Sequence, residues 1–297
     1  MNDRIVGVGE VLWDWLATGP QLGGAPANFA YHARALGGEA HVITRVGNDD
    51  YGREIHRRFR AMGLPEATVQ VDETAPTGTA KVEISGNGLA HFTITENVAW
   101  DHIALVPEAT TVASVADAIC FGSLAQRCEV SASTIRGLVA AAPANALRVF
   151  DINLRQEFYS RSLIERSLEL ANVFKLNDDE LPIVAAIFGL TGTTTQQIEQ
   201  IAQRFNLRVV ALTRGANGSL IYKEGRWSEC GSRPVRVVDT VGAGDSFTAA
   251  LVLGLLRKVD LDELNAIANE VARYVCSQAG ATPPMPEEFT RKLSRTL

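Results

Sequence analysis

The chain has 297 residues, of which 46% are hydrophobic and 21% charged, and its formal net charge is −6. These values predict one or two globular domains with a large apolar core, and the acidic balance disfavours nucleic acid as the main partner, because nucleic acid requires a basic face. The four cysteines show no metal-binding or disulfide spacing, and the longest apolar helical run, 247–256, is about half a membrane span, so we expect a cytoplasmic protein without a membrane partner.

The first part of the chain predicts the start of an alternating strand and helix series. Residues 5–9, Ile-Val-Gly-Val-Gly, indicate a buried strand. A glycine-rich turn at 23–28 then opens a helix that extends to about residue 36, with Pro26 in its first turn, where proline is tolerated. A strand at 41–46 and a helix at 52–62 follow.

The residues from 69 to 95 have a different pattern of polar and apolar side chains from the rest of the chain. Two runs, 81–84 and 91–94, alternate polar and apolar side chains around Gly86-Asn87-Gly88, which is a strong hairpin signal. We interpret the hairpin as part of a small β-sheet lid, formed by insertions at about 10–20 and 69–97. The alternative is a hairpin at the edge of the main sheet. A lid would need cover for its apolar face, which predicts a homodimer joined through the lid. That face comprises Val82, Ile84, Phe92 and Ile94.

After residue 101 the alternation of strands and helices resumes. The predicted strands are 118–121, 148–152, 173–176, 208–212 and 219–222, and the predicted helices are 132–142, 163–170, 179–188, 195–205, 247–256 and 261–277. Short strands that alternate with helices predict a mainly parallel sheet covered on both faces. We therefore expect a single three-layer α/β/α domain over residues 1–297, with the small lid inserted into it.

Polar side chains follow the predicted strand ends at five places. In open parallel sheets, ligands bind at the carboxyl ends of the strands. The sequence therefore predicts a ligand site at this edge of the sheet. The five places are Asp14, Asp151 with Asn153, Asn177, Thr213 with Gly215, and Asp245.

The stretch 239–247, Asp-Thr-Val-Gly-Ala-Gly-Asp-Ser-Phe, has the composition of an anion site. A strand-like run at 235–238 leads into it and an apolar helix leads out. A helix that begins at about Ala243 points its free N–H groups and its positive end at a ligand such as phosphate. Asp245, in the first turn, would repel that phosphate unless it handles a proton. A phosphate cradle beside a carboxylate indicates phosphoryl transfer to a hydroxyl group.

Two other nucleotide motifs are absent from the sequence. A P-loop requires Gly-Lys, and none of the five lysines follows a glycine. The run Gly7-Val8-Gly9 starts like a dinucleotide fingerprint, but Leu12 stands where a glycine or alanine belongs. A nicotinamide-dependent oxidoreductase is therefore disfavoured.

These motifs together resemble those of a known enzyme family. Residues 239–247 are similar to the C-terminal signature of the ribokinase-like (PfkB-type) sugar kinases, and residues 23–30, Gly-Gly-Ala-Pro-Ala-Asn-Phe-Ala, resemble their N-terminal glycine-rich signature. The runs 9–14, 150–155 and 177–180 fall in the order and spacing of that family, so the resemblance covers essentially the whole chain. Together, the runs 9–14 and 23–30 most resemble those of the fructokinase subgroup.

The resemblance implies roles for residues on the sugar side of the site. Asp245 would be the base that takes the proton from the sugar hydroxyl, and the amides of Gly242, Ala243 and Gly244 would form the anion hole. The alternative is that Asp245 only complements the helix dipole. The remaining residues implied to bind the sugar are Asp14, Gly24, Asn28 and Arg155. Asp14 could instead be a turn residue, Asn28 a polar group of the first helical turn and Arg155 a solvated side chain.

The resemblance also implies a nucleotide side. Asn177 and Glu180 would position Mg²⁺ and phosphate, Glu180 through water, although the same pair would form a capping box. The implied nucleotide-binding positions are Thr213, Gly215 and Gly218, with Asn269 facing the adenine; the glycines could also be simple turns. Asp239 would take part in a monovalent-cation site for K⁺.

The resemblance implies an ATP- and Mg²⁺-dependent sugar kinase, with fructose as the favoured acceptor. Kinases for ribose, a nucleoside or 2-keto-3-deoxygluconate carry the same signatures and stay open as alternatives. A catalytically silent sugar-binding regulator is another alternative, but it would not need Asp245. The five histidines have no metal or catalytic spacing, and we expect them to be structural or on the surface.

Overall fold

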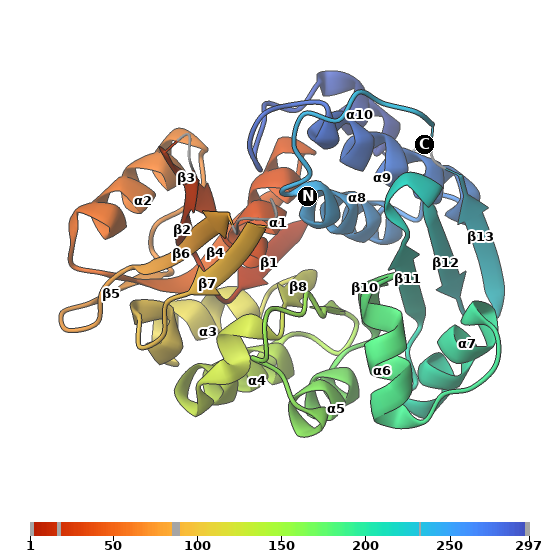
Figure 1. Cartoon of the computed structure of the whole chain (residues 1–297), viewed down its shortest axis with the longest axis horizontal. Helices are drawn as coiled ribbons and strands as arrows, with labels where there is room; N and C mark the ends of the chain where they lie inside the picture. Colours follow the sequence, from red (N-terminus) through yellow and green to blue (C-terminus); the bar gives the residue numbers. More distant parts are fainter. Residues whose placement is uncertain (1–2, 17–18, 85–89, 232, 295–297) are drawn as a thin grey trace.

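A computed structural model describes residues 3–16, 19–84, 90–231 and 233–294 of the chain. It contains a large sheet between two layers of helices and a smaller second sheet at one side (Figure 1). The α-helices are α1 Ala25–Ala35, α2 Asp50–Ala61, α3 Pro107–Ala113, α4 Glu129–Ala141, α5 Arg161–Leu170, α6 Glu180–Phe188, α7 Thr194–Arg204, α8 Ala243–Leu256, α9 Leu261–Cys276 and α10 Glu287–Lys292. Short 3-10 helices are η1 Ala99–His102, η2 Leu124–Arg127 and η3 Gly215–Asn217.

The large sheet has the strand order β13-β12-β11-β10-β9-β8-β1-β4-β5 in the described part of the chain. Its strands are β1 Arg4–Val8, β4 Glu39–Gly47, β5 Val69–Asp72, β8 Ala118–Phe121, β9 Leu147–Asp151, β10 Val173–Asn177, β11 Val209–Thr213, β12 Ser219–Lys223 and β13 Arg226–Cys230. Pairing is parallel from β5 to β11, and β12 is antiparallel to both of its neighbours. The predicted, mainly parallel sheet is confirmed.

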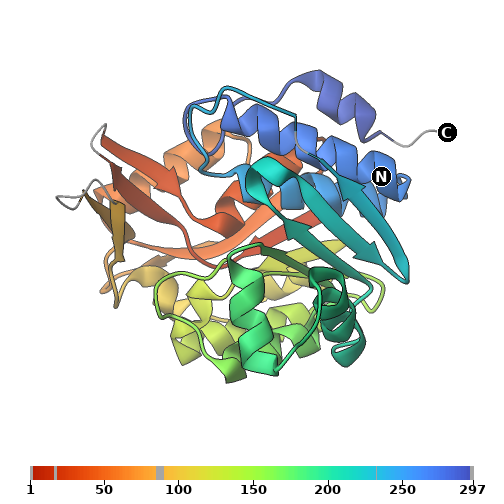
Figure 2. The same ribbon diagram turned by 45° about the vertical axis from the view of Figure 1, so that its right-hand side comes forward.

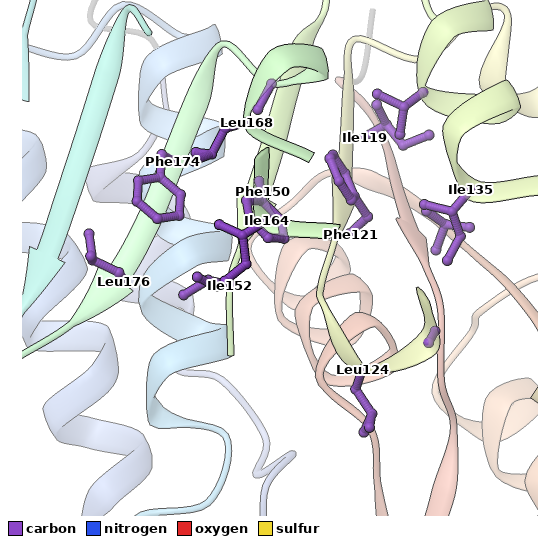
Figure 3. Packing of buried hydrophobic residues seen from close by; sticks show 14 of the residues in the cluster. Ile119, Phe121, Leu124, Ile135, Phe150, Ile152, Ile164, Leu168, Phe174 and Leu176 are labelled. Carbon is purple, nitrogen blue, oxygen red and sulfur yellow. The ribbon is translucent and has the colours of Figure 1, made fainter. Parts of the chain in front are cut away.

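Alternate residues of the strands face two different cores, because side chains in a strand point to opposite faces. On one face, phenylalanines from β8, β9 and β10 stack in a row, with ring centroids 5.3 Å apart for Phe121 and Phe150 and 5.7 Å for Phe150 and Phe174 (Figure 3). Helices α3 to α7 cover this face, and α1, α2, α8, α9 and α10 cover the other. Figure 2 shows the two helical layers on either side of the sheet.

Close packing of α1 on β1 depends on a single glycine. A Cβ atom at Gly7 would lie 2.3 Å from the carbonyl oxygen of Pro26 in the first turn of α1. Only a residue without a side chain allows this approach. The contact sets the position of α1, whose Asn28 faces the site described below.

The small sheet has the order β3-β2-β6-β7, with β2 Leu12–Leu16, β3 Gly19–Gly23, β6 Gly78–Ile84 and β7 Ala90–Ile94. Strands β6 and β7 pair antiparallel in the register Ala80↔Ile94, and β2 pairs with β6. The hairpin therefore belongs to a separate sheet and is not an edge hairpin of the large one. Its turn at Gly86-Asn87-Gly88 lies outside the described residues.

Three expectations need correction. The range 69–97 includes β5, which pairs with β4 and so extends the large sheet. Ile94 is buried with 6% of its surface exposed, so it is not part of an open apolar face; the side chains of Val82, Ile84 and Phe92 lie outside the described residues. The run at 235–238 forms no strand, and Val237 and Val238 are more than half exposed.

Among the described helices, none has both the length and the hydropathy that crossing a bilayer requires.

Candidate functional site

The candidate site lies where the parallel strands of the large sheet end. Asp151 is the last residue of β9, Asn177 of β10 and Thr213 of β11, and Glu10 follows β1. The first turn of α8, which begins at Ala243, lies at the same edge, because a Cβ atom built at Gly244 would lie 3.1 Å from Nζ of Lys175 and Thr248 bonds to Asp151. The structure thus brings polar groups from separate parts of the chain together, as the strand-end pattern predicts.

The start of α8 is a turn that only glycine can form. Gly242 is the N-cap, with φ 79° in the left-handed region. A Cβ atom there would lie 2.3 Å from the carbonyl oxygen of Ala281. The first N–H groups of a helix have no partner within the helix. The amide of Ala243 donates to the carbonyl oxygen of Thr240 at 3.3 Å, whereas the amides of Gly244 and Asp245 meet no acceptor among the described residues and remain available to an anion.

Asp245 is held in the first turn of α8 by α1. Its Oδ2 atom accepts a hydrogen bond of 2.9 Å from Nδ2 of Asn28. Burial raises the pKa of the Asp245 carboxyl to about 6, and the neighbouring Asp151 acts in the same direction. The hydrogen bond from Asn28 and the charges of Lys175 and Arg155 oppose the shift. A carboxylate with a pKa near the working pH is suited to accept a proton.

A buried ion pair lies beneath this turn. Nζ of Lys175 in β10 is 3.1 Å from Oδ1 of Asp151, and both side chains are less than a tenth exposed. The other oxygen of Asp151 accepts a 2.8 Å hydrogen bond from the Thr248 hydroxyl of α8. Sequence reasoning gave no role to Lys175 or Thr248, because their adjacency to Asp245 depends on the order of the strands.

A second group of acids lies on the small-sheet side. Burial raises the pKa of Asp14 in β2 to about 6, and Arg155 opposes this shift. Glu10 is 2% exposed, and burial raises the pKa of its carboxyl to about 7. Its Oε2 atom has no hydrogen-bond partner among the described residues. Glu10 lies in the run 9–14, but no role was predicted for it from the sequence. A glutamate directly after a buried strand was an available signal, because glutamate is rarely buried without a partner.

Gly24 and Arg155 lie beside this second group of acids. Gly24 has φ 113°, and a Cβ atom there would lie 2.5 Å from the carbonyl oxygen of Glu10, so the turn before α1 is pressed against this acid. Arg155 is exposed, and its charge acts on Glu10, Asp14 and Asp245. Asn28 contacts Asp245 directly, and the charge of Arg155 acts on both Asp245 and Asp14. The part of these residues in binding a sugar stays a prediction.

Asn177 and Glu180 form a reciprocal cap at the start of α6. Oδ1 of Asn177 accepts from the amide of Glu180 at 2.9 Å, and Oε2 of Glu180 accepts from the amide of Asn177 at 2.8 Å. The other oxygen, Oε1, accepts from the amide of Leu154 at 2.9 Å. The capping alternative is therefore present. Burial raises the pKa of Glu180, with Lys175 opposing the shift.

The expected nucleotide loop lies beyond β11. Gly215 and Gly218 have φ values of 51° and 81°, and no atom lies within 4 Å of a Cβ atom built at Gly215. Asn269 of α9 donates from Nδ2 to Oγ of Ser219 at 2.6 Å, which places it beside Gly218. The structure thus brings Asn269 close to the loop, with its amide engaged by protein groups.

Asp239 connects the anion-hole turn to the segment after α9. Its Oδ1 atom accepts from the amide of Val241 at 3.0 Å, and Oδ2 accepts from the amide of Gly280 at 3.1 Å. On the same segment, Nε2 of His32 is 2.9 Å from the carbonyl oxygen of Ala281, so Nε2 carries the proton. Burial lowers the pKa of His32 to about 4. Asp239 therefore has a structural role, because it links the turn before α8 to the segment after α9. Its part in a cation site stays a prediction.

The described residues contain no group of three or more His, Cys, Asp or Glu side chains arranged to hold a metal ion. Glu180 would fit a position that contacts Mg²⁺ through water rather than directly, because both of its carboxylate oxygens already accept backbone hydrogen bonds. Each oxygen keeps a further lone pair for a water molecule.

Comparisons with known proteins agree on one family. The profile of the pfkB family carbohydrate kinases matches residues 18–288. A fructokinase of Klebsiella pneumoniae is 30% identical over 283 residues, which cover 92% of this chain and 91% of the relative. The structure of an uncharacterized sugar kinase from Pyrococcus horikoshii in complex with ATP has a TM-score of 0.83 and 25% identity, and the match covers 97% of this chain and 99% of the other. A fructokinase from Vibrio cholerae O395 with bound fructose, ADP and calcium ion has a TM-score of 0.79 at 22% identity, covering 98% and 100%.

Proposed function

Because the chain belongs to the pfkB family of carbohydrate kinases, we propose that it transfers the γ-phosphoryl group of ATP to a hydroxymethyl oxygen of fructose. The observation that carries this proposal is the placement of Asp245. Its carboxylate is fixed by Asn28 in the first turn of a helix whose free amides favour an anion. A base and an anion site thus lie within one turn of α8.

The proton and the phosphoryl group move in one displacement. The ionised carboxylate of Asp245 accepts the proton of the sugar hydroxyl, and the hydroxyl oxygen bonds to the γ-phosphorus while the bond from that phosphorus to the β-phosphate oxygen breaks. ADP leaves with the electron pair of that bond, and Asp245 later returns its proton to water. The amides after Gly242 stabilise the charge on the moving phosphoryl group.

The sugar is oriented by groups on the other side of Asp245. Asp14 in β2 accepts hydrogen bonds from sugar hydroxyls, and Asn28 contributes its amide next to the base. Support for fructose comes from the Klebsiella pneumoniae relative, which is named a fructokinase. Arg155 is a cation whose charge acts on Asp245, and it keeps 2-keto-3-deoxygluconate as the second candidate acceptor.

ATP and Mg²⁺ bind on the side of β10 and β11. Asn177 and Glu180 hold the hydrated Mg²⁺ and the phosphates, while Thr213, Gly215 and Gly218 line the nucleotide, with Asn269 toward the adenine. When bound, Mg²⁺ neutralises phosphate charge. A K⁺ site would use Asp239 and carbonyls of the segment around Ala281.

The small sheet forms a lid over the sugar, since β2 carries Asp14 and the amide of Ile94 in β7 donates to Oε1 of Gln156 at 3.4 Å in the loop that follows Arg155. A homodimer joined through this sheet would cover Trp15, which is 43% exposed. Light scattering across protein concentrations tests the dimer, and a monomer at every concentration would refute it. The four cysteines are free thiols, which fits the proposed cytoplasmic location.

One experiment tests the proposed activity. ADP release is measured with fructose, ribose, adenosine and 2-keto-3-deoxygluconate, for the wild type and for Asp245→Asn. We expect the highest kcat/KM with fructose and a loss of about 10²–10⁴-fold in the variant. Turnover of none of the four acceptors would refute the function and favour a silent sugar-binding regulator. Near-full activity of Asp245→Asn would refute the mechanism.

A further inference from the structure

A lysine is buried beneath the proposed anion hole. Lys175 is 6% exposed, and burying an ammonium group without compensation is costly. Although burial alone would lower the pKa of Lys175, the carboxylates of Asp151, Glu180 and Asp245 raise it above its ordinary value. The side chain therefore carries its charge inside the protein.

The ammonium group faces α8 directly. A Cβ atom built at Gly244 would lie 3.1 Å from Nζ of Lys175, so the lysine touches the first helical turn from below. Asp151 fixes the lysine at 3.1 Å and is itself fixed by Thr248, one turn further along the same helix. The Thr248 hydroxyl also lies 3.0 Å from the carbonyl oxygen of Gly244. Strands β9 and β10 are thereby tied to two turns of α8.

We propose that Lys175 is a positioning residue whose buried ammonium group, anchored by Asp151, holds the first turn of α8 and keeps Asp245 in its ionised form. This inference rests on the proposed role of Asp245 as the base. Nothing in the family resemblance assigns a role to Lys175, and its adjacency to Gly244 follows from the neighbouring positions of β9 and β10 beneath α8.

The charges around Asp245 explain why such a cation is needed. Asp151 from β9 and Glu10 after β1 are acids that act against ionisation of Asp245. The opposing groups are Lys175 from β10, Arg155 from the loop after β9 and the neutral amide of Asn28 from α1. Arg155 is exposed and screened by water, whereas Lys175 is buried. The remaining titratable groups that face Lys175 are Glu180 and the Cys120 thiol.

The test is the pH dependence of kcat/KM in three variants, which remove a cation, an acid and a neutral hydroxyl group near Asp245. The acidic limb of each profile is the fall of kcat/KM toward low pH, and its midpoint reports the pKa of Asp245. Lys175→Met removes the cation, so the acidic limb moves to higher pH by about one unit. Asp151→Asn removes an acid, so the limb moves to lower pH. Thr248→Val removes the hydroxyl that anchors Asp151 without changing any charge, so the rate falls while the limb keeps its position.

A role confined to packing would not move the limb in opposite directions. Unchanged limbs in Lys175→Met and Asp151→Asn, with the wild-type unfolding temperature retained, would overturn the inference. Should Lys175→Met fail to fold, Lys175→Gln replaces it, because glutamine also removes the cation and can still donate a hydrogen bond to Asp151. Asp151→Asn alone does not decide, since loss of the Asp151 charge moves the limb to lower pH whatever Lys175 does. Asp245→Asn distinguishes failure of the proposed function from failure of this inference. If Asp245→Asn is inactive while the acidic limbs of Lys175→Met and Asp151→Asn stay at the wild-type position, the proposed function stands and the role of Lys175 is refuted.

Discussion

Replacing Gly242 by alanine tests the anion-hole turn most directly. Two costs follow from the structure. An L-residue in the left-handed region at φ 79° costs about 1–2 kcal/mol. In addition, the new Cβ atom would meet the carbonyl oxygen of Ala281 at 2.3 Å, so the turn or the facing segment must move by roughly 1 Å to restore an ordinary contact. We expect a loss of about 2–4 kcal/mol in the free energy of unfolding.

The activity should fall more than this stability loss explains. A misplacement of about 1 Å in a catalytic group costs roughly 10²-fold in rate, and Gly242 positions the amides that precede Asp245. The assay is kcat with saturating ATP and fructose, together with urea unfolding. Gly189→Ala is the matched control, because Gly189 has φ 68° at the end of α6 with no atom within 4 Å of a new Cβ atom. A Gly242→Ala enzyme with kcat within twofold of Gly189→Ala would refute the reasoning.

Three further predictions use the pH dependence and the buried cap. Because the pKa of Asp245 is raised to about 6 and only its ionised form accepts a proton, kcat/KM should fall about tenfold per pH unit below 6; a flat profile from pH 7 to 5 would contradict this. The folded-state pKa of His32 is lowered from 6.5 to about 4, so stability present above pH 6.5 is lost as the pH falls toward 4; His32→Gln, which can still donate to Ala281, should lose less stability over that window in urea titrations, and an equal loss would refute it. Glu180→Gln places an amide donor against the N–H of Asn177 or Leu154, so we expect about 1–3 kcal/mol of destabilisation and a higher Mg²⁺ requirement; wild-type values for both would rule this out.

The sequence indicated most of the alternating fold, because hydrophobic periodicity is a local signal. It failed where structure depends on a distant partner. The valines at 235–238 have the composition of a strand, but no strand in the described part of the chain pairs with them. The amides of Val238 and Asp239 bond instead to the carbonyl oxygen of Cys276. Conversely, the prediction that 69–72 belongs to the small sheet is wrong, because this run pairs with β4 and a short run carries no information about which sheet edge it joins.

The site followed the same division. Asp245 and Gly242 were recognisable, because a helix start with two glycines and an acid is a local feature. Lys175 was not, since its charge acquires meaning only when β9 and β10 lie side by side beneath α8. A lysine within an otherwise apolar strand was the available signal, because lysine is rarely buried without a partner.

The balance of charge in the site bears on the choice of acceptor. The site holds four acids, namely Glu10, Asp14, Asp151 and the base Asp245. The cations that act on them are Lys175, which is already engaged by Asp151, and Arg155. The raised pKa values of three of these acids reflect an environment that resists further negative charge. An uncharged polyol can donate hydrogen bonds from its hydroxyl groups to these carboxylates. A sugar acid instead adds an anion that the exposed Arg155 would have to compensate, because Lys175 is already engaged by Asp151. The electrostatics therefore favour fructose over 2-keto-3-deoxygluconate in our proposal. An acidic acceptor would depend on Arg155 to compensate its carboxylate.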